Sequence, residues 1–188
     1  MADVSFKREF LEAHNSYRKL HGAPPLALSS ELNATAQKWA DRLLALGLMN
    51  HSDTKDGENI YTVLKSEQLT AKEAVDSWYS EVKDYNWNNP GLKSNTGHFT
   101  QVVWKETTQL GVGVATVGTR SYVVAQYRPA GNMTMPGKFE SNVLRQGSNG
   151  ARGSGGSSTG GGDGGKWKRR EKSKGNGQTE NTLCCTLL

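Results

Sequence analysis

The chain has 188 residues, of which 35% are hydrophobic and 22% are charged. This supplies one core of ordinary size, but the length is too small for two full domains. No run approaches the roughly 18 consecutive apolar residues of a membrane-spanning helix, and the N-terminus lacks the apolar block of a secretory signal. We therefore expect a single globular domain that is released into the cytosol and is not secreted.

The formal net charge of +5 is unevenly distributed. Residues 146–188 contain seven basic and three acidic side chains, whereas residues 1–145 contain 16 basic and 15 acidic ones. Most of the net positive charge therefore lies in residues 146–188, and it does not predict an anionic partner for residues 1–145. The only cysteines are the adjacent Cys184 and Cys185, which cannot cross-link a fold and suit a reducing compartment.

Two amphipathic helices are predicted in the first third of the chain. Apolar residues at three- and four-residue spacing predict one helix over about 4–20, ending before Gly22. Ser29 or Ser30 can cap a second helix, for which Gly47 is a plausible C-cap. The predicted apolar faces are Phe10, Leu11, His14 and Tyr17 in the first helix, and Leu32, Ala36, Trp39, Ala40 and Leu43 in the second.

A third helix and a hairpin follow. Thr70 and Glu73 form a capping box that opens the helix, and Glu81, three residues after Trp78, is expected on nearly the same face as that tryptophan. Residues 110–117 and 121–127 are rich in β-branched and aromatic side chains and are separated by a short turn, which predicts a β-hairpin. Helices that precede late-pairing strands favour an α+β fold.

Four residues form the candidate chemical site. His51 and His98 lie in polar segments that we expect to be irregular, Glu58 lies at the apparent start of a strand, and Glu81 lies on the third helix. Imidazole and carboxylate together are the ligand set of zinc and related divalent ions, and the same pair could act as general base and acid. The other two histidines have simpler interpretations: we expect His14 to be a hydrogen-bonded structural residue, and His21 to lie at the surface.

Two segments resemble the signatures of the CAP superfamily, which comprises cysteine-rich secretory proteins, antigen 5 and plant pathogenesis-related proteins. They are GHFTQVVW at residues 97–104 and QYRPAGN at residues 126–132. Shorter matches occur at residues 14–18, 51–52, 57–59 and 78–81, so the resemblance runs in order over about residues 6–145. It is greatest to the cytosolic, Golgi-associated branch of the superfamily.

The resemblance implies a three-layer α-β-α sandwich, the CAP fold, with an open cleft. Its cleft-lining histidines and glutamates map onto His51, His98, Glu58 and Glu81, which would weakly hold zinc or another divalent cation. Family members have been linked to sterol, fatty-acid and anionic-lipid binding, and this branch to dimers on the cytosolic membrane face. Because no general enzymatic activity is settled for the fold, we lean against an enzyme.

Two departures from the family pattern bear on localisation. Ala125 occupies the position where most secreted members have a cysteine, two residues before the tyrosine of the second signature. Ala2 follows Met1, whereas the myristoyl signal of the Golgi-associated relatives needs glycine there. We therefore expect a cytosolic protein without an N-terminal myristoyl anchor.

The tail predicts a different anchor. We divide the chain into a CAP (SCP-like) domain over residues 1–145, a flexible linker over 146–165 with ten glycines in twenty residues, and a disordered tail segment over 166–188. The last four residues fit the prenylation pattern at Cys185, where a final leucine favours geranylgeranyl, and Cys184 could take a palmitoyl or a second prenyl group. A basic run supplies a second, electrostatic membrane signal through Lys166, Lys168, Arg169, Arg170, Lys172 and Lys174.

Three functional hypotheses follow. The leading one is a non-enzymatic CAP-domain protein, lipid-anchored to the cytoplasmic face of the Golgi or plasma membrane, that binds lipids or protein partners and can form a homodimer. The alternative is a zinc-dependent protease or esterase, in which His51 and His98 hold the ion and Glu58 or Glu81 activates its water. Nucleic-acid binding by the tail is disfavoured, because Trp167 is the only aromatic residue among its charges.

Overall fold

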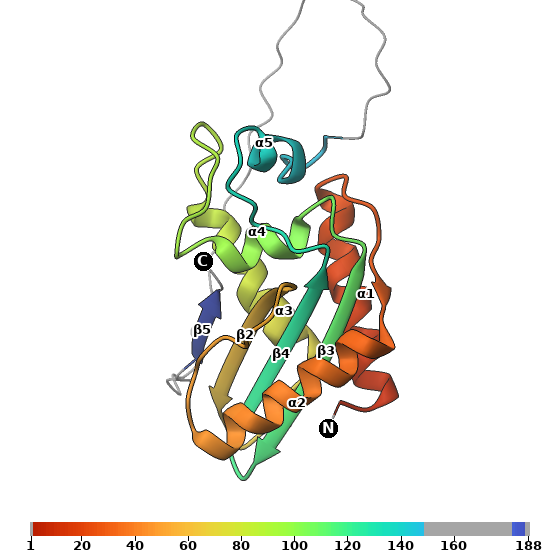
Figure 1. Ribbon diagram of the computed structural model, residues 1–188, viewed down its shortest axis with the longest axis vertical. Coiled ribbons are helices and arrows are strands. Elements are labelled where there is room, and N and C mark those ends of the chain that lie inside the picture. Colours follow the sequence, from red (N-terminus) through yellow and green to blue (C-terminus); the bar gives the residue numbers. More distant parts are fainter. Residues whose placement is uncertain (1, 149–181, 187–188) are drawn as a thin grey trace, which may run out of the picture.

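The computed structural model describes residues 2–148 and 182–186. A five-stranded sheet of order β1-β3-β4-β2-β5 carries α2 on one face and α1 and α3 on the other, with α4 and α5 at one end (Figure 1). This three-layer arrangement of helices and sheet confirms the predicted α+β sandwich. The strands are β1 Ala27–Leu28, β2 Gly57–Leu64, β3 Gln109–Val117, β4 Arg120–Arg128 and β5 Thr182–Thr186; the helices are α1 Val4–Leu20, α2 Ser30–Leu46, α3 Ala71–Tyr79, α4 Gly97–Val103 and α5 Lys138–Asn142.

The three predicted helices begin at polar caps. Asp3 caps α1, Ser29 caps α2, and Thr70 forms the expected capping box with Glu73 at the start of α3. Gly47 ends α2 in the left-handed conformation, with φ of 63°, as its residue type favours. One expectation was wrong in detail: α3 ends at Tyr79, and Glu81 lies on the following 3₁₀ helix η1 (Ser80–Asp84). The tighter turn aims Glu81 at the start of α4.

The predicted hairpin is present as β3 and β4, which pair antiparallel and are joined through a two-residue turn that begins at Gly118, with φ of 55°. β2 pairs antiparallel with β4 from Gly57 opposite Tyr127 to Leu64 opposite Arg120. The short β1 runs parallel to β3 and was not predicted. β5 pairs antiparallel with the other side of β2, so Thr182–Thr186, part of the tail predicted to be disordered, is a strand.

The core has two parts, one on each face of the sheet. Between the sheet and α1 and α3 it contains the fully buried Trp78 and Trp104. On the opposite face α2 packs so closely on β3 that a Cβ added at Gly111 or Gly113 would overlap the backbone of α2. The smaller cluster on this face consists of Ala36, Ala40, Leu43, Ile60, Ala115, Tyr122 and Val124.

Two histidine expectations are corrected. His98 lies in α4, not in an irregular segment, and every residue of α4 is buried. His21 is fully buried instead of exposed: its ring contacts the Leu144 carbonyl and the Tyr79 hydroxyl at 2.6 and 2.9 Å. His14 is a hydrogen-bonded buried residue, as predicted.

The described part of the domain extends slightly past the predicted boundary at residue 145, to residue 148. Its last residues return to α1, since the backbone N–H of Gly147 donates to the Leu20 carbonyl at 3.1 Å. The predicted linker beyond residue 148 and the basic run 166–174 lie outside the described residues. Among the described helices, none combines the length and the apolar character needed to cross a bilayer.

Candidate functional site

Glu81 and His98 form the first of two histidine–glutamate pairs. Glu81 Oε1 lies 2.6 Å from His98 Nδ1, and Oε2 accepts from the backbone N–H groups of His98 and Phe99 at 3.0 and 3.1 Å. The His98 side chain is only 3% exposed. The carboxylate therefore both caps the first turn of α4 and fixes the ring, with Nδ1 as the donor and Nε2 as the acceptor. His98 Nε2 is buried and has no hydrogen-bond partner in the described part of the chain.

Glu58 and His51 form the second pair. Glu58 Oε1 lies 2.8 Å from His51 Nδ1 and accepts from the Ser52 backbone at 2.9 Å. Its other oxygen accepts from the Ser52 hydroxyl at 2.5 Å and from Gln126 Nε2 at 3.2 Å. Burial raises the pKa of Glu58, but these hydrogen bonds outweigh burial and leave the pKa below its ordinary value. The carboxylate of Glu58 thus positions the side chains of His51, Ser52 and Gln126.

Gln126 is itself held from α2, because Thr35 Oγ1 donates to its Oε1 at 2.5 Å. The path from Thr35 through Gln126 to Glu58 connects α2, β4 and β2 to the loop that carries His51. Sequence reasoning noted Gln126 only as a signature residue and missed the roles of Thr35 and Ser52. Thr35 and Ser52 are distant from Gln126 in the sequence, so the sequence alone does not indicate that they lie beside it in the fold.

The structure thus arranges the predicted set of four as two pairs. β2 links them, since Glu58 belongs to one pair and the adjacent Asn59 donates to the His98 carbonyl at 3.2 Å. No group of three or more His, Cys, Asp or Glu side chains within the described residues is arranged to hold a metal ion. Each pair has the chemistry of an oriented imidazole ligand, because the glutamate contacts Nδ1 and Nε2 is then the atom that can bind a metal. Nε2 of His98 has no hydrogen-bond partner within the described residues.

The two signature segments are hydrogen-bonded to each other. Gln101 Oε1 accepts from the Gly131 backbone at 2.8 Å, and Asn132 Nδ2 donates to the Gly97 carbonyl at 2.9 Å. Asn132 has φ of 59°, and its Oδ1 accepts from the Thr100 hydroxyl at 2.6 Å. Hydrogen bonds from the second signature, residues 126–132, therefore hold α4 in position. A cavity of about 170 Å³ lies at this junction, lined by Thr54, Lys55, Asp56, Gly57, Glu58, Gln101, Ala130, Gly131, Asn132 and Met133.

A buried arginine holds the other end of α4. The Arg18 guanidinium is fully buried and donates to the carbonyls of Val102 and Trp104 at 3.1 and 2.8 Å. It also donates to the carbonyls of Pro24 and Thr107, at 2.8 and 2.9 Å. Burial lowers the pKa of Arg18 to about 10. A cation at the carbonyl end of a helix is electrostatically favourable, so Arg18 positions the helix that carries His98.

A buried chain of hydrogen bonds leads from α1 to the site. His14 Nδ1 contacts the Phe10 carbonyl at 2.9 Å, so Nδ1 carries the proton and Nε2 accepts from the Tyr127 hydroxyl at 2.9 Å. Asn59 Nδ2 donates to the same hydroxyl at 3.3 Å as well as to the His98 carbonyl. Burial lowers the pKa of His14 to about 3, which keeps the ring neutral in this chain.

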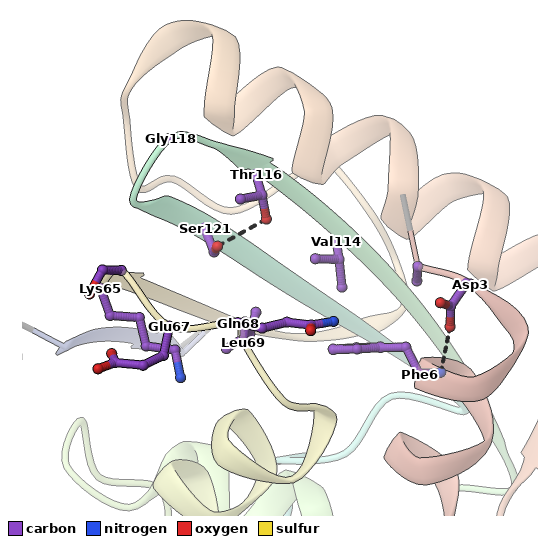
Figure 2. A pocket seen from close by; sticks show the side chains of 12 residues that line it. Asp3, Phe6, Lys65, Glu67, Gln68, Leu69, Val114, Thr116, Gly118 and Ser121 are labelled. Atoms are coloured by element: carbon purple, nitrogen blue, oxygen red, sulfur yellow. Dashed lines mark hydrogen bonds between the residues drawn. The ribbon is translucent and has the colours of Figure 1, made fainter.

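A larger cavity, of about 360 Å³, lies elsewhere and includes none of the predicted site residues. Figure 2 shows it between the start of α1, the β3–β4 hairpin and the loop after β2. Phe6, Leu69 and Val114 give it apolar walls, and Thr116 and Ser121 meet there in a 2.9 Å hydroxyl contact. Lys65 beside it is paired with Glu73 at 2.5 Å. Its lining has no neighbouring imidazole, so it does not extend the histidine–glutamate site.

Comparison with known sequences identifies relatives along most of the domain. The profile of the family described as "CAP: Cysteine-rich secretory protein family" matches residues 11–127. Golgi-associated plant pathogenesis-related protein 1 of Homo sapiens is 46% identical over 148 residues, which cover 76% of this chain and 95% of that protein. Repressed by EFG1 protein 1 of Candida albicans is 39% identical over 136 residues, which cover 70% of this chain but only 49% of that protein.

Solved structures agree with the fold. The crystal structure of NaASP2 with Zn²⁺ has a TM-score of 0.63 and 28% identity, over 78% of this chain and 88% of that one. The structure of BmVAL-1 has a TM-score of 0.63 and 26% identity, over 77% of this chain and 84% of that one. The zinc ion named with the first of these belongs to that protein.

Proposed function

Because the chain belongs to the cysteine-rich secretory protein (CAP) family, we propose that it is a non-enzymatic, membrane-associated binding protein whose histidine–glutamate cleft can hold a divalent metal ion. The observation that carries this proposal is that the carboxylates of Glu58 and Glu81 each make hydrogen bonds with a histidine ring and with neighbouring backbone N–H groups. Such carboxylates orient imidazoles for binding and are poorly placed to move protons.

The metal site of this proposal uses His51 and His98 through Nε2, with Glu58 and Glu81 as their positioning residues. A related protein whose structure was solved with Zn²⁺ supports the choice of zinc. When bound, a divalent ion would supply a positive centre for an anionic ligand group. The chain's own contribution is to fix both rings in one tautomer and to hold α4 in place from both ends.

The alternative function, a zinc-dependent hydrolase, needs Glu58 or Glu81 to take a proton from water. Hydrogen bonds lower the pKa of Glu58, which makes it a weaker base than an ordinary glutamate. Both carboxylate oxygens of Glu81 are engaged in hydrogen bonds with residues of α4. These contacts favour the binding function over hydrolysis.

We place the protein on the cytoplasmic face of the Golgi or plasma membrane, with an anionic membrane surface and its lipids as partners, and with a homodimer as a further assembly. The human relative named as Golgi-associated, which matches along 95% of its length, supports the Golgi assignment. The prenylation pattern at Cys185 and the basic run 166–174 support attachment. The basic run lies outside the described residues, so this part rests on sequence.

Membrane fractionation of the full chain expressed in eukaryotic cells tests the proposal. Cys185→Ser should move the protein from the membrane to the soluble fraction, whereas Cys184→Ser, its matched control, should leave a large membrane-bound share. Zinc titration of the purified chain tests the cleft: wild type should bind, and the double variant His51→Asn, His98→Asn should lose at least tenfold in affinity. Unchanged fractionation would refute the tether, and unchanged zinc binding would refute the metal site.

A further inference from the structure

The outer edge of β2 carries a strand from the far end of the chain. β5 pairs antiparallel with β2 over five residues, from Asn59 opposite Thr186 to Val63 opposite Thr182. Figure 1 shows β5 lying alongside β2 at the margin of the sheet, next to the C-terminus. Without β5, β2 would be the edge strand of the described sheet, since β4 occupies only its other side.

The edge of β2 is well suited to accept a strand. Along an antiparallel ladder, alternate residues turn their N–H and C=O groups toward each neighbour, so an uncovered β2 would present a row of unpaired groups. Ile60 and Val63 are fully buried, and Tyr61 is 5% exposed, so the strand is held firmly in the core. A rigid, extended, unpaired edge is a template for strand addition.

The segment that occupies this edge contains the predicted lipidation site. The backbone of Cys184 lies opposite Tyr61, and that of Cys185 lies opposite Ile60. Lipid transfer to a C-terminal cysteine requires that the last residues enter a transferase as a free peptide, and a backbone engaged in a ladder is unavailable for this. Docked β5 also lies close to α4, the helix of His98.

We propose that the β2 edge is a strand-binding site for the chain's own C-terminal segment, and that docking there withholds Cys185 from lipid transfer. This inference rests on the proposed membrane tether for its second half. In the transfer step the thiolate of Cys185 attacks the first carbon of geranylgeranyl diphosphate. The thiol has already given up its proton to form this thiolate; a C–S bond then forms, the C–O bond to diphosphate breaks, and diphosphate leaves. While β5 is paired with β2, its backbone is not free to enter the transferase, so Cys185 is withheld from this step.

A proline variant of the full, unlipidated chain tests the inference. Leu183→Pro lies within β5 but outside the last four residues, and it removes a backbone donor from the ladder. Gln178→Pro, before the strand begins, is the matched control. Two quantities are measured: amide hydrogen exchange of residues 59–63, and the initial rate of transfer from geranylgeranyl diphosphate by a geranylgeranyltransferase.

We expect Leu183→Pro to speed exchange at alternate amides of β2 by about tenfold or more and to raise the initial transfer rate, with Gln178→Pro behaving like wild type. Unchanged exchange in β2 would overturn the docking. Faster exchange with an unchanged transfer rate would overturn the withholding of Cys185. If no form accepts the lipid while Leu183→Pro still speeds exchange, the tether of the proposed function fails although the strand site stands.

Discussion

Glu81 holds His98 by its ring and by its backbone at once, through contacts of 2.6 and 3.0 Å to the two carboxylate oxygens. One side chain from η1 thus sets both where α4 begins and how its histidine is turned. The geometry of the ring cannot change without disturbing the helix, and the helix cannot shift without disturbing the ring. Structure and the proposed metal site are therefore coupled at this residue.

The first prediction concerns Glu81→Gln. The amide retains one acceptor but places an NH₂ group against donors, so part of this contact set is lost. We expect the free energy of unfolding to fall by about 1–3 kcal/mol and zinc affinity to fall by about 10–100-fold. Urea denaturation and zinc titration measure the two effects. Glu67→Gln, at an exposed carboxylate, is the control and should change neither. Normal zinc affinity in Glu81→Gln would contradict the positioning role.

The second prediction is an acid sensitivity that arises from His14. Its folded-state pKa of about 3 lies below the ordinary value of 6.5, so between these two values the unfolded chain binds a proton that the folded chain does not. Stability should therefore fall as pH falls through this window, by about 1.4 kcal/mol per pH unit from this residue. His21, whose pKa burial also lowers, adds to the same slope.

His14→Gln should reduce that slope between pH 6 and pH 4, as measured by urea denaturation at several pH values. The wild-type protein offers a second measurement that does not depend on the variant's stability. Its His14 ring should remain neutral at pH 5 by NMR, while an ordinary histidine would be almost fully protonated. A charged His14 ring at pH 5 would refute the account.

The sequence predicts those elements of the fold that are determined by neighbouring residues in the chain, and it predicts poorly those determined by distant contacts. Asp3, Ser29 and Thr70 are local helix caps, and each of the segments that follow them has one apolar face. The first three helices can therefore be predicted from the sequence. The turn that begins at Gly118 likewise marks the hairpin. α4 has no such signal: all of its residues are buried, so it lacks the alternation of apolar and polar faces that predicts a helix.

The candidate site shows the same division. Its four residues were identified from residue types and from resemblance, but their pairing was not. Glu81 meets His98 across 17 residues only because η1 turns it toward α4, and Glu58 meets His51 because Ser52 and Gln126 hold the carboxylate. The strand β5 depends on pairing across more than a hundred residues, which no local pattern in Thr182–Thr186 reveals.

The third prediction concerns Arg18, which donates to four backbone carbonyls around the end of α4. Arg18→Met keeps much of the buried volume but removes the guanidinium donor from all four carbonyls, of which the Trp104 carbonyl retains the Thr107 backbone N–H at 3.2 Å. We therefore expect a loss of about 2–4 kcal/mol in unfolding free energy. The unfolding free energy of Arg18→Lys should lie between those of the wild type and Arg18→Met. A lysine ammonium keeps the charge but has fewer N–H donors than a guanidinium and lacks its planar geometry. Arg8→Met, at an exposed arginine of the same helix, is the control and should be nearly neutral. Equal stability of the Arg8 and Arg18 variants would show that α4 does not need this contact.

The last prediction concerns the junction of the two signatures. A Cβ at Gly131 would lie 2.7 Å from Gln101 Nε2 and 2.8 Å from Trp104 Cγ, closer than such atoms approach in proteins. Since Trp104 is fully buried and cannot retreat, Gly131→Ala must push the second signature away from α4 and weaken the Gly131 to Gln101 hydrogen bond. We expect a loss of about 1–3 kcal/mol, measured by thermal and urea unfolding. Gly91→Ala is the matched control, because nothing lies within 4 Å of its added Cβ, and it should be neutral or slightly stabilising. If Gly131→Ala is as stable as Gly91→Ala, the junction tolerates separation and does not fix α4, and the position of His98 must then depend on the contacts from Arg18, Glu81 and Asn59.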